Sequence, residues 1–201
     1  LNVNMEKIKS STILETENLI QYNYILMSIH REENVDSEQN FSDLLESIEE
    51  ITRIYQMPVI ISTHPRTRIK LEAMNYEHTN PLVRFSKPYG FHEYNKLQMD
   101  AFCVLSDSGT ITEESSLLNI PAVTIRQAHE RPEGMDEGTL IMAGLNKKRV
   151  IDAINIVTKQ HDRNQRAMKV VADYDVDNVS KKVVRIILSY TDYINRTVWF
   201  K

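Results

Sequence analysis

The protein has 201 residues, and 24 Lys or Arg against 28 Asp or Glu give it a formal net charge of -4. A chain of this length buries enough apolar surface to fold without disulfides or a structural metal. Its single cysteine, Cys103, excludes an internal disulfide and a cysteine-rich zinc site, and it favours a reducing, cytoplasmic compartment. We therefore expect neither a disulfide-stabilised domain nor a zinc finger.

Charge and hydropathy also narrow the range of partners. Duplex binding depends on many contacts from a basic face to phosphates, so a slightly acidic chain argues against nucleic acid as the main partner. No apolar stretch approaches the length that spans a membrane, and residues 1–20 are polar and helical in character rather than signal-like. A small anionic ligand held by a few local donors is compatible with this composition.

Six short apolar runs divide the chain, and the last of them is weaker than the others. Each run is continuous rather than alternating, which is typical of strands that are buried on both faces of a parallel sheet. The predicted strands are residues 24–29, 58–62, 82–85, 101–105, 122–125 and 139–142.

Segments with apolar residues three and four positions apart lie between these runs. The clearest follows Asp36, where one apolar stripe predicts a long helix with Asp36 and Gln39 as its capping pair. Strict alternation of strand and helix predicts a doubly wound, Rossmann-like α/β fold, whose ligand site lies at the carboxyl ends of the strands. The other predicted helices are residues 68–74, 92–99, 110–118, 147–159 and 178–194.

Four polar clusters directly follow predicted strands, at residues 28–34, 62–66, 106–110 and 126–133. Because the carboxyl ends of parallel strands meet at one edge of the sheet, we expect these clusters to converge there. Residues 106–114 combine a strand end, a tight turn and a helix start, which presents free N–H groups to an anion. This turn is neither a Walker A loop nor a G-x-G-x-x-G dinucleotide motif.

Two interpretations stay open for the start of this helix. Thr110 and Glu113 form an ordinary capping box in one of them, and the turn binds an anion in the other. Glu114 is suited to accept hydrogen bonds from two sugar hydroxyls. The alternative is that Glu114 lies on an exposed helix surface and binds no ligand.

His30 and His64 follow adjacent predicted strands and are suited to metal binding, general acid chemistry or phosphate contacts. The alternative for each is a hydrogen-bonded histidine without a ligand, and no H-x-x-x-H pair or cysteine lies nearby, so no metal site is predicted. A serine hydrolase built from Ser108, His30 and Asp107 is rejected because the chain has no G-x-S-x-G motif.

Arginines and tyrosines complete the candidate site. Planar guanidinium groups suit a diphosphate, and aromatic rings suit a nucleotide base. Surface ion pairs and core packing are the respective alternatives. The arginines are Arg31, Arg66, Arg126 and Arg131, and the tyrosines are Tyr89 and Tyr94.

Three motifs together resemble those of a known family: His-Arg-Glu-Glu-Asn at 30–34, Ser-Asp-Ser-Gly at 106–109 and Glu-Arg-Pro-Glu at 130–133. In order and spacing they are similar to the second half of the non-hydrolysing UDP-N-acetylglucosamine 2-epimerases. The resemblance implies one domain of a GT-B type two-domain enzyme, a UDP-sugar substrate, no cofactor and a homodimer. It also implies that UDP is eliminated from carbon 1 and added back after inversion at carbon 2.

The resemblance further assigns roles by position. His30 matches the family's essential active-site histidine, and Arg31 and His64 resemble residues that some members use for a second, regulatory UDP-sugar. The other matches concern UDP: a diphosphate turn, an acid on the ribose, one tyrosine at uracil, a second at another nucleotide-side position, and one substrate-contacting arginine. The turn is Ser108, Gly109 and Thr110, and the ribose acid is Glu114. The tyrosines are Tyr94 at uracil and Tyr89, and the arginine is Arg131.

Two departures and one finer similarity accompany these matches. Thr110 stands where the family commonly has a second glycine, and Ala128-His129 stands where it commonly has a different pair of residues before Glu130. Residues 28–36, 106–110 and 126–135 look like the branch that converts UDP-2-acetamido-2,6-dideoxy-L-talose to UDP-N-acetyl-L-fucosamine for capsule or O-antigen.

By the same resemblance, residues 1–20 are a helical segment left from a preceding domain, and residues 21–177 are the UDP-binding domain. Residues 178–201 are a helix that crosses back to the N-terminal domain of the two-domain enzyme. The family's acid/base carboxylates lie in its N-terminal domain, so the chain is expected to bind UDP and to be inactive alone. Two alternatives stay open. One is the nucleotide half of a GT-B glycosyltransferase, and the other is a non-catalytic nucleotide-sugar sensor that does not need His30.

Overall fold

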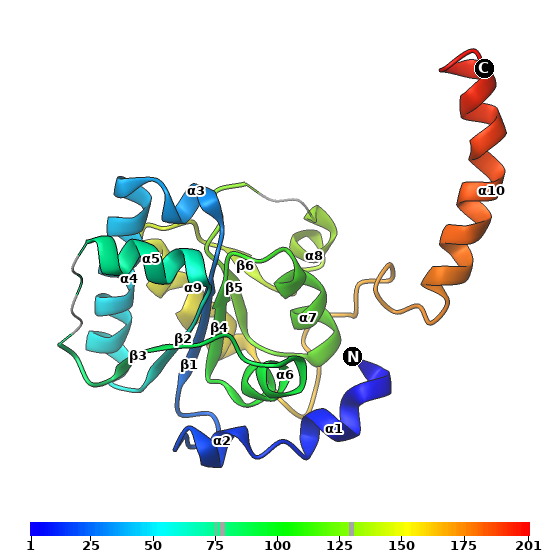
Figure 1. The fold of residues 1–201 in the computed structure, drawn as a ribbon. Helices are drawn as coiled ribbons and strands as arrows, with labels where there is room; N and C mark the ends of the chain where they lie inside the picture. Colours follow the sequence, from blue (N-terminus) through cyan, green and yellow to red (C-terminus); the bar gives the residue numbers. More distant parts are fainter. Residues whose placement is uncertain (75, 77–78, 129–130) are drawn as a thin grey trace. The chain divides into compact units, whose positions relative to one another are not determined.

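The computed structural model describes residues 1–74, 76, 79–128 and 131–201. By its internal contacts the chain divides into two units, Leu1–Val171 and Ala172–Lys201. The first unit contains the whole sheet, and the second contains one long helix (Figure 1). The assignment of residues 1–20 and 178–201 to parts of a two-domain protein stays a prediction.

A six-stranded parallel sheet forms the centre of the first unit (Figure 1). Its order is β3-β2-β1-β4-β5-β6, with Ile25 of β1 opposite both Val59 of β2 and Cys103 of β4. This confirms the predicted Rossmann-like, doubly wound α/β class, and each predicted apolar run overlaps one strand. The strands are β1 (Ile25–Ile29), β2 (Val59–Thr63), β3 (Val83–Ser86), β4 (Cys103–Ser106), β5 (Ala122–Thr124) and β6 (Ile141–Met142).

Helices cover both faces of the sheet. Successive residues of each strand point to opposite faces, so a continuous apolar strand presents apolar side chains on both sides that helices must bury. Met27 and Ile61 belong to the core on one face, and Leu26 and Ile60 belong to the core on the other. The continuous apolar runs are therefore explained by burial on two sides. The first face is covered by α4 (Glu38–Tyr55), α5 (Pro65–Ala73) and α9 (Lys147–Gln160), and the second by α6 (Phe91–Asp100) and α7 (Thr110–Leu118).

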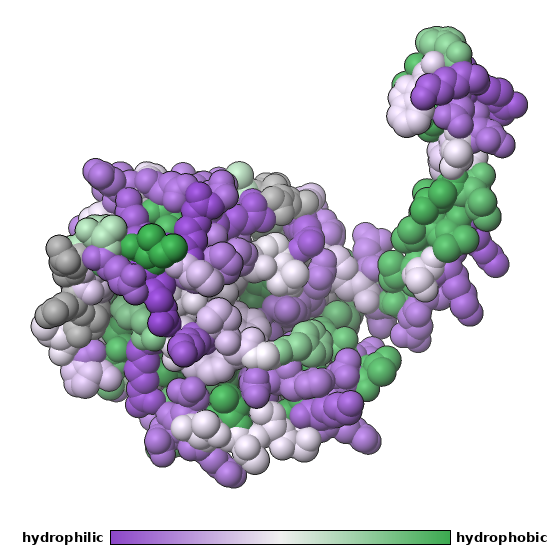
Figure 2. Space-filling model, in the orientation of Figure 1, coloured by the Kyte–Doolittle hydropathy of each residue, from purple (hydrophilic) through white to green (hydrophobic). Residues whose placement is uncertain are grey.

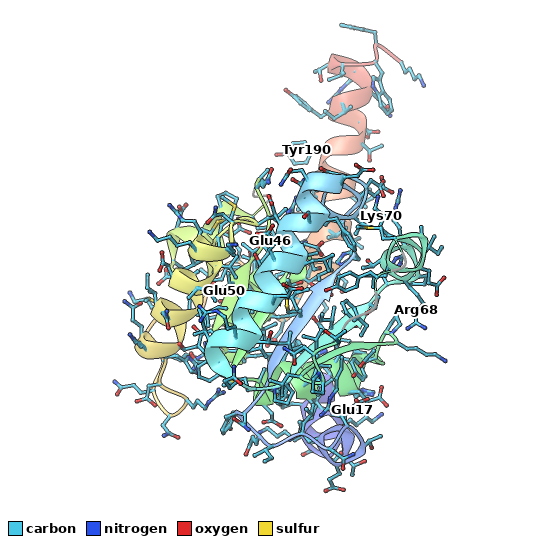
Figure 3. All side chains as sticks on the ribbon, turned by 90° about the vertical axis from the view of Figure 1, so that its left-hand side faces the viewer. Glu17, Glu46, Glu50, Arg68, Lys70 and Tyr190 are labelled. Carbon is cyan, nitrogen blue, oxygen red and sulfur yellow. The ribbon has the colours of Figure 1, made fainter. Side chains whose placement is uncertain are left out.

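Helix α4 shows why apolar spacing predicted these helices. Its stripe, which includes Phe41, Leu44 and Ile48, is buried against the sheet. Glu46 and Glu50 lie on the other side of the same helix, as Figure 3 shows. Separation of apolar and acidic residues on opposite sides fixes which side of α4 faces the core.

The N-terminal residues form short helices, and three of their apolar side chains are buried within the first unit. Ile13 and Leu19 join the core on the α6 face, and Ile8 is completely buried. The hydroxyl of Tyr24 donates a hydrogen bond to the carbonyl of Leu97 in α6 at 2.6 Å. These helices are η1 (Asn2–Asn4), α1 (Met5–Lys9) and α2 (Ile13–Thr16).

The predicted cap of α4 is wrong by one residue. Ser37 is the N-cap, and its Oγ accepts a hydrogen bond from the Asn40 N–H at 3.3 Å. Asp36 instead accepts a hydrogen bond from Nη2 of Arg66 at 2.8 Å, which ties this turn to α5. An ion pair between distant segments therefore overrides the local capping preference of Asp36.

Three further helical segments differ from the predictions. Helix α5 begins at Pro65 rather than at residue 68, because proline fits the first helical position and His64 Nδ1 accepts the Arg66 N–H at 3.4 Å. Two short helices were not predicted, α3 (Glu32–Val35) and α8 (Pro132–Asp136). Neither is long enough to show an apolar period.

The second unit consists of residues 172–201, with α10 (Val179–Thr197) as its helix. None of the residues of α10 is buried, and its apolar side chains, among them Val183, Ile187 and Tyr190, are exposed. Figure 2 shows hydrophobic residues gathered along this helix. Within the part of the chain that the structure describes, no helix has the length and apolarity needed to cross a membrane.

Candidate functional site

The sheet order reverses between β1 and β4, which is the switch point where doubly wound sheets carry a ligand crevice. β1 and β4 are neighbours, but the chain leaves β1 toward β2 and leaves β4 toward β5. In doubly wound sheets, ligands bind outside the carboxyl ends of the strands at such a switch point. The predicted clusters after β1 and β4 therefore flank the crevice, with those after β2 and β5 next to them.

Asp107 joins the two sides of this crevice. It follows β4 directly, and its side chain is completely buried. Its carboxylate accepts hydrogen bonds from the backbone N–H groups of His30, at 3.1 Å to each oxygen, and of Arg31, at 2.9 Å. It also accepts one from Asn34 Nδ2 at 3.2 Å. The segment after β1 is thus held by an acid from the neighbouring strand.

The predicted His30 lies against the same carboxylate. Its Nδ1 is 3.1 Å from Asp107 Oδ1, while 40% of its side chain is exposed. The ring of His64, from the end of β2, has its centroid 6.4 Å from that of His30. Arg31 Nε donates a hydrogen bond to the Asp107 carbonyl at 3.3 Å. The structure therefore brings His30, Arg31 and His64 together at one edge.

The predicted anion turn connects β4 to α7. Its polar atoms face one another: the Ser108 N–H donates to Ser106 Oγ at 3.0 Å, and Ser108 Oγ lies 3.0 Å from Thr110 Oγ1. The predicted capping box of Thr110 with Glu113 is wrong. Gly109 is the N-cap and already has helical φ and ψ angles, so Thr110 is the first residue inside the helix. Gly109 has no side chain to cap this N-terminus, and the Thr110 N–H donates a hydrogen bond to Ser108 Oγ at 3.3 Å.

A small cleft lies beside this turn and contains two arginines. Arg126 is only 6% exposed, and Arg131 Nε lies 3.3 Å from Glu113 Oε1. Nη1 of Arg131 is buried and has no hydrogen-bond partner among the described residues. Guanidinium groups beside a helix start suit an anion. The cleft is lined by Ser108, Gly109, Thr112, Thr124, Arg126, Ala128, Arg131 and Met135.

Glu114 lies on the second turn of α7 and is partly buried. Gln98 Nε2 of α6 donates a hydrogen bond to Glu114 Oε2 at 2.7 Å. Burial raises the pKa of Glu114, and Glu113 adds to the increase, while Gln98, Thr110 and Arg131 oppose it. The surroundings of Glu114 therefore favour its protonated form relative to a carboxyl in water.

The two predicted tyrosines lie near α6. Burial is the main cause that raises the pKa of Tyr94 to about 12, with the charge of Glu114 as the second. Ser28 at the end of β1 lies next to the Tyr94 hydroxyl, so this residue belongs to the edge that carries His30. Tyr89 packs against the core on the α6 face, and burial raises its pKa to about 12.

Sequence reasoning missed the central role of Asp107, together with Asn34 and Gln98. The sequence shows an acid directly after a predicted strand, but only the topology shows that this strand neighbours the one before His30. His129 and Glu130, which belong to the fourth predicted cluster, lie outside the described residues. Among the described residues, no group of three or more His, Cys, Asp and Glu side chains is placed to hold a metal ion.

The comparisons with known proteins agree on one family. A family model described as UDP-N-acetylglucosamine 2-epimerase matches residues 1–188. The UDP-N-acetylglucosamine 2-epimerase of Methanocaldococcus jannaschii is 33% identical over 159 residues, which are 78% of this chain and 42% of that protein. The chain spans about half the length of such curated relatives.

Solved structures show the same likeness in three dimensions. The UDP-N-acetylglucosamine 2-epimerase of Rickettsia bellii is 48% identical with a TM-score of 0.86, covering 100% of this chain and 53% of that one. The Neisseria meningitidis UDP-GlcNAc 2-epimerase bound to UDP-GlcNAc is 26% identical with a TM-score of 0.74, covering 93% and 52%. An Escherichia coli ADP-heptose heptosyltransferase, at 15% identity and a TM-score of 0.53, shares the fold alone.

Proposed function

We propose that this chain forms the UDP-binding half of a nucleotide-sugar 2-epimerase, because it belongs to the UDP-N-acetylglucosamine 2-epimerase family. One observation carries the proposal for the binding site. Helix α7 begins at the polar turn of Ser108, Gly109 and Thr110 and, one turn later, carries the partly buried acid Glu114. A nucleoside diphosphate needs this combination of anion donors and a hydroxyl acceptor at neighbouring positions.

Each part of UDP then has a proposed partner. Ser108, Gly109 and Thr110 donate to the diphosphate, with the partly buried guanidinium of Arg131, whose Nη1 atom is buried, beside them. Glu114 accepts hydrogen bonds from the two ribose hydroxyls. The aromatic faces of Tyr94 and Tyr89 line the base side. Three chemically different contacts give selectivity for a uridine nucleotide over a bare diphosphate.

The proposed reaction is elimination followed by addition. Carbon 2 of a nucleotide sugar has no neighbouring carbonyl, so its proton is removed as the bond between carbon 1 and the diphosphate oxygen breaks. UDP then adds back to the 2-acetamidoglycal while carbon 2 is protonated from the opposite face. The donors around Ser108 and Arg131 stabilise the negative charge of departing UDP, and His30 is the proposed catalytic residue of this half.

Two finer assignments complete the proposal. The 201 residues correspond to about half of each relative, so we assign UDP binding to them and place turnover in a homodimeric two-domain GT-B enzyme. The proposed product is UDP-N-acetyl-L-fucosamine for capsular or O-antigen polysaccharide, with Arg31 and His64 holding a regulatory UDP-sugar. A relative that is 29% identical, a UDP-2,3-diacetamido-2,3-dideoxy-D-glucuronate 2-epimerase of Pseudomonas aeruginosa, supports a range of sugars within the family.

Calorimetric titration tests the nucleotide site. We expect the chain to bind UDP and to bind ADP at least tenfold more weakly. Glu114→Gln should weaken UDP binding about tenfold, since a charged acceptor contributes about 1.5 kcal/mol or more to a hydrogen bond. It should change pyrophosphate binding by less than about twofold. Glu72→Gln, an exposed acid on α5, is the matched control.

Equal losses for UDP and pyrophosphate in Glu114→Gln would refute the ribose contact. A second titration is made after the other half of a relative has been added to the chain. If UDP binds in neither titration, the nucleotide site itself is refuted. Turnover by the 201 residues alone would overturn the assignment of catalysis to the two-domain enzyme.

A further inference from the structure

We infer that Asp107 is a positioning residue, which fixes the tautomer and ring orientation of His30 so that Nε2 is the nitrogen presented to the sugar nucleotide. The inference rests on the proposed role of His30 and deepens it. It concerns the acid that follows β4, whereas His30 follows β1. No residue of the nucleotide-binding turn is required to act in it.

The geometry shows a carboxylate surrounded by donors. Oδ1 of Asp107 faces the His30 N–H and His30 Nδ1, each at 3.1 Å. Oδ2 faces the N–H groups of His30 and Arg31, at 3.1 and 2.9 Å, and Asn34 Nδ2 at 3.2 Å. The Asp107 side chain is completely buried, while that of His30 is 40% exposed. The Nδ1 end of the imidazole is therefore fixed, while the side chain stays partly exposed.

The chemistry of the two groups determines the tautomer. An ionised carboxylate accepts hydrogen bonds and donates none, so the Nδ1 atom at 3.1 Å must carry a proton to bond with it. In a neutral imidazole the other nitrogen, Nε2, then has its lone pair free. The bonds from the His30 backbone N–H to the same carboxylate hold the main chain in place. The contact of Nδ1 with Oδ1 then fixes the orientation of the ring.

This arrangement predicts a specific effect of an isosteric amide. In Asp107→Asn one oxygen becomes an NH₂ group, which donates rather than accepts. Turned toward His30 Nδ1, the NH₂ favours the opposite tautomer, with the proton on Nε2. Turned to the other side, it meets three donors that it cannot satisfy, the N–H groups of His30 and Arg31 and Nδ2 of Asn34, so this orientation is disfavoured. Loss of the carboxylate therefore changes the protonation pattern of His30 even where the backbone is preserved.

Nitrogen-15 NMR of the histidine-labelled chain tests the inference, at a pH high enough that the imidazole shifts no longer change with pH. Loss of a signal in His30→Gln identifies the His30 resonances. We expect His30 to carry its proton on Nδ1 in the wild type. In Asp107→Asn we expect most molecules to carry it on Nε2. Asp100→Asn, which replaces a buried acid on α6, is the control and should leave the His30 tautomer unchanged.

The wild-type spectrum is decisive even if Asp107→Asn does not fold. A proton on Nδ1 supports the inference, and a proton on Nε2 overturns it. A folded Asp107→Asn with an unchanged Nδ1–H tautomer also overturns it. These measurements need no nucleotide, so a failure of UDP binding would count against the proposed function and would be distinct from a failure of the positioning role.

Discussion

Asp107 and Glu114 are acids at the same edge of one sheet, but their surroundings differ in what they supply. Asp107 is enclosed by donors from the segment after β1 and is completely buried. Glu114 on α7 has Gln98 as its close donor, and burial raises its pKa. A carboxylate whose acceptor sites are filled by its own protein serves organisation. A carboxylate with acceptor capacity left, such as that of Glu114, is available to a ligand.

The largest expected effect follows from the donors around Asp107. Asp107→Ala should lower the free energy of unfolding by about 3 kcal/mol, because it leaves several buried N–H groups without an acceptor. Glu114→Ala should lower it by less than about 1 kcal/mol. Urea denaturation of both variants measures the difference. Equal losses would show that the two acids do not divide their roles in this way.

The next effect concerns pH and the affinity for UDP. The raised pKa of Glu114 means that this carboxyl is still protonated where an ordinary glutamate is ionised. Because ribose hydroxyls donate best to the ionised form, the affinity of the wild type should increase up to about tenfold as the pH rises through that pKa. The affinity ratio of wild type to Glu114→Gln isolates this from titration of UDP. A constant ratio would contradict the prediction.

Stability should depend on pH in the opposite direction. The folded state binds the Glu114 proton more tightly than the unfolded state, because burial raises the pKa. The contribution of this group is therefore fully present below the unfolded pKa and is lost as the pH rises through the folded pKa. Thermal unfolding of wild type and Glu114→Gln should diverge by a few degrees over that interval. Parallel curves would argue that Glu114 is solvated like an ordinary surface acid.

The smallest effect concerns the ring next to Glu114. Tyr94→Phe keeps the aromatic face and removes the hydroxyl beside Ser28, so the free energy of unfolding should fall by about 1 kcal/mol. UDP affinity should change by less than about threefold, since the proposed base contact uses the ring. A large loss of affinity with unchanged stability would assign the ligand contact to the hydroxyl instead.

Much of the fold could be predicted because the relevant signals are local. Each continuous apolar run overlaps a strand, and the stripe that includes Phe41 and Ile48 gave the long helix α4. Caps were less predictable. Asp36 is a good capping residue by type, but its ion pair with Arg66, thirty positions along the chain, leaves Ser37 as the cap.

The candidate site was predicted in part for the same reason. Ser108, Gly109 and Thr110 follow one another, so their turn was visible in the sequence. The arrangement around Asp107 was not visible, because its partners His30 and Asn34 come from the far side of three crossovers. Strand order decides which polar clusters meet, and periodicity alone does not determine strand order.

The distance along the chain between Asp107 and its partners has a kinetic consequence. Its bonds to His30 and Arg31 close loops of 77 and 76 positions, and they form only when β4 has docked beside β1. Contacts of this sequence separation are costly to close early in folding. We expect Asp107→Ala to speed unfolding while the refolding rate stays nearly constant, as stopped-flow measurements in urea can test. The reactive edge would then be the last part of the sheet unit to become ordered and the first to open.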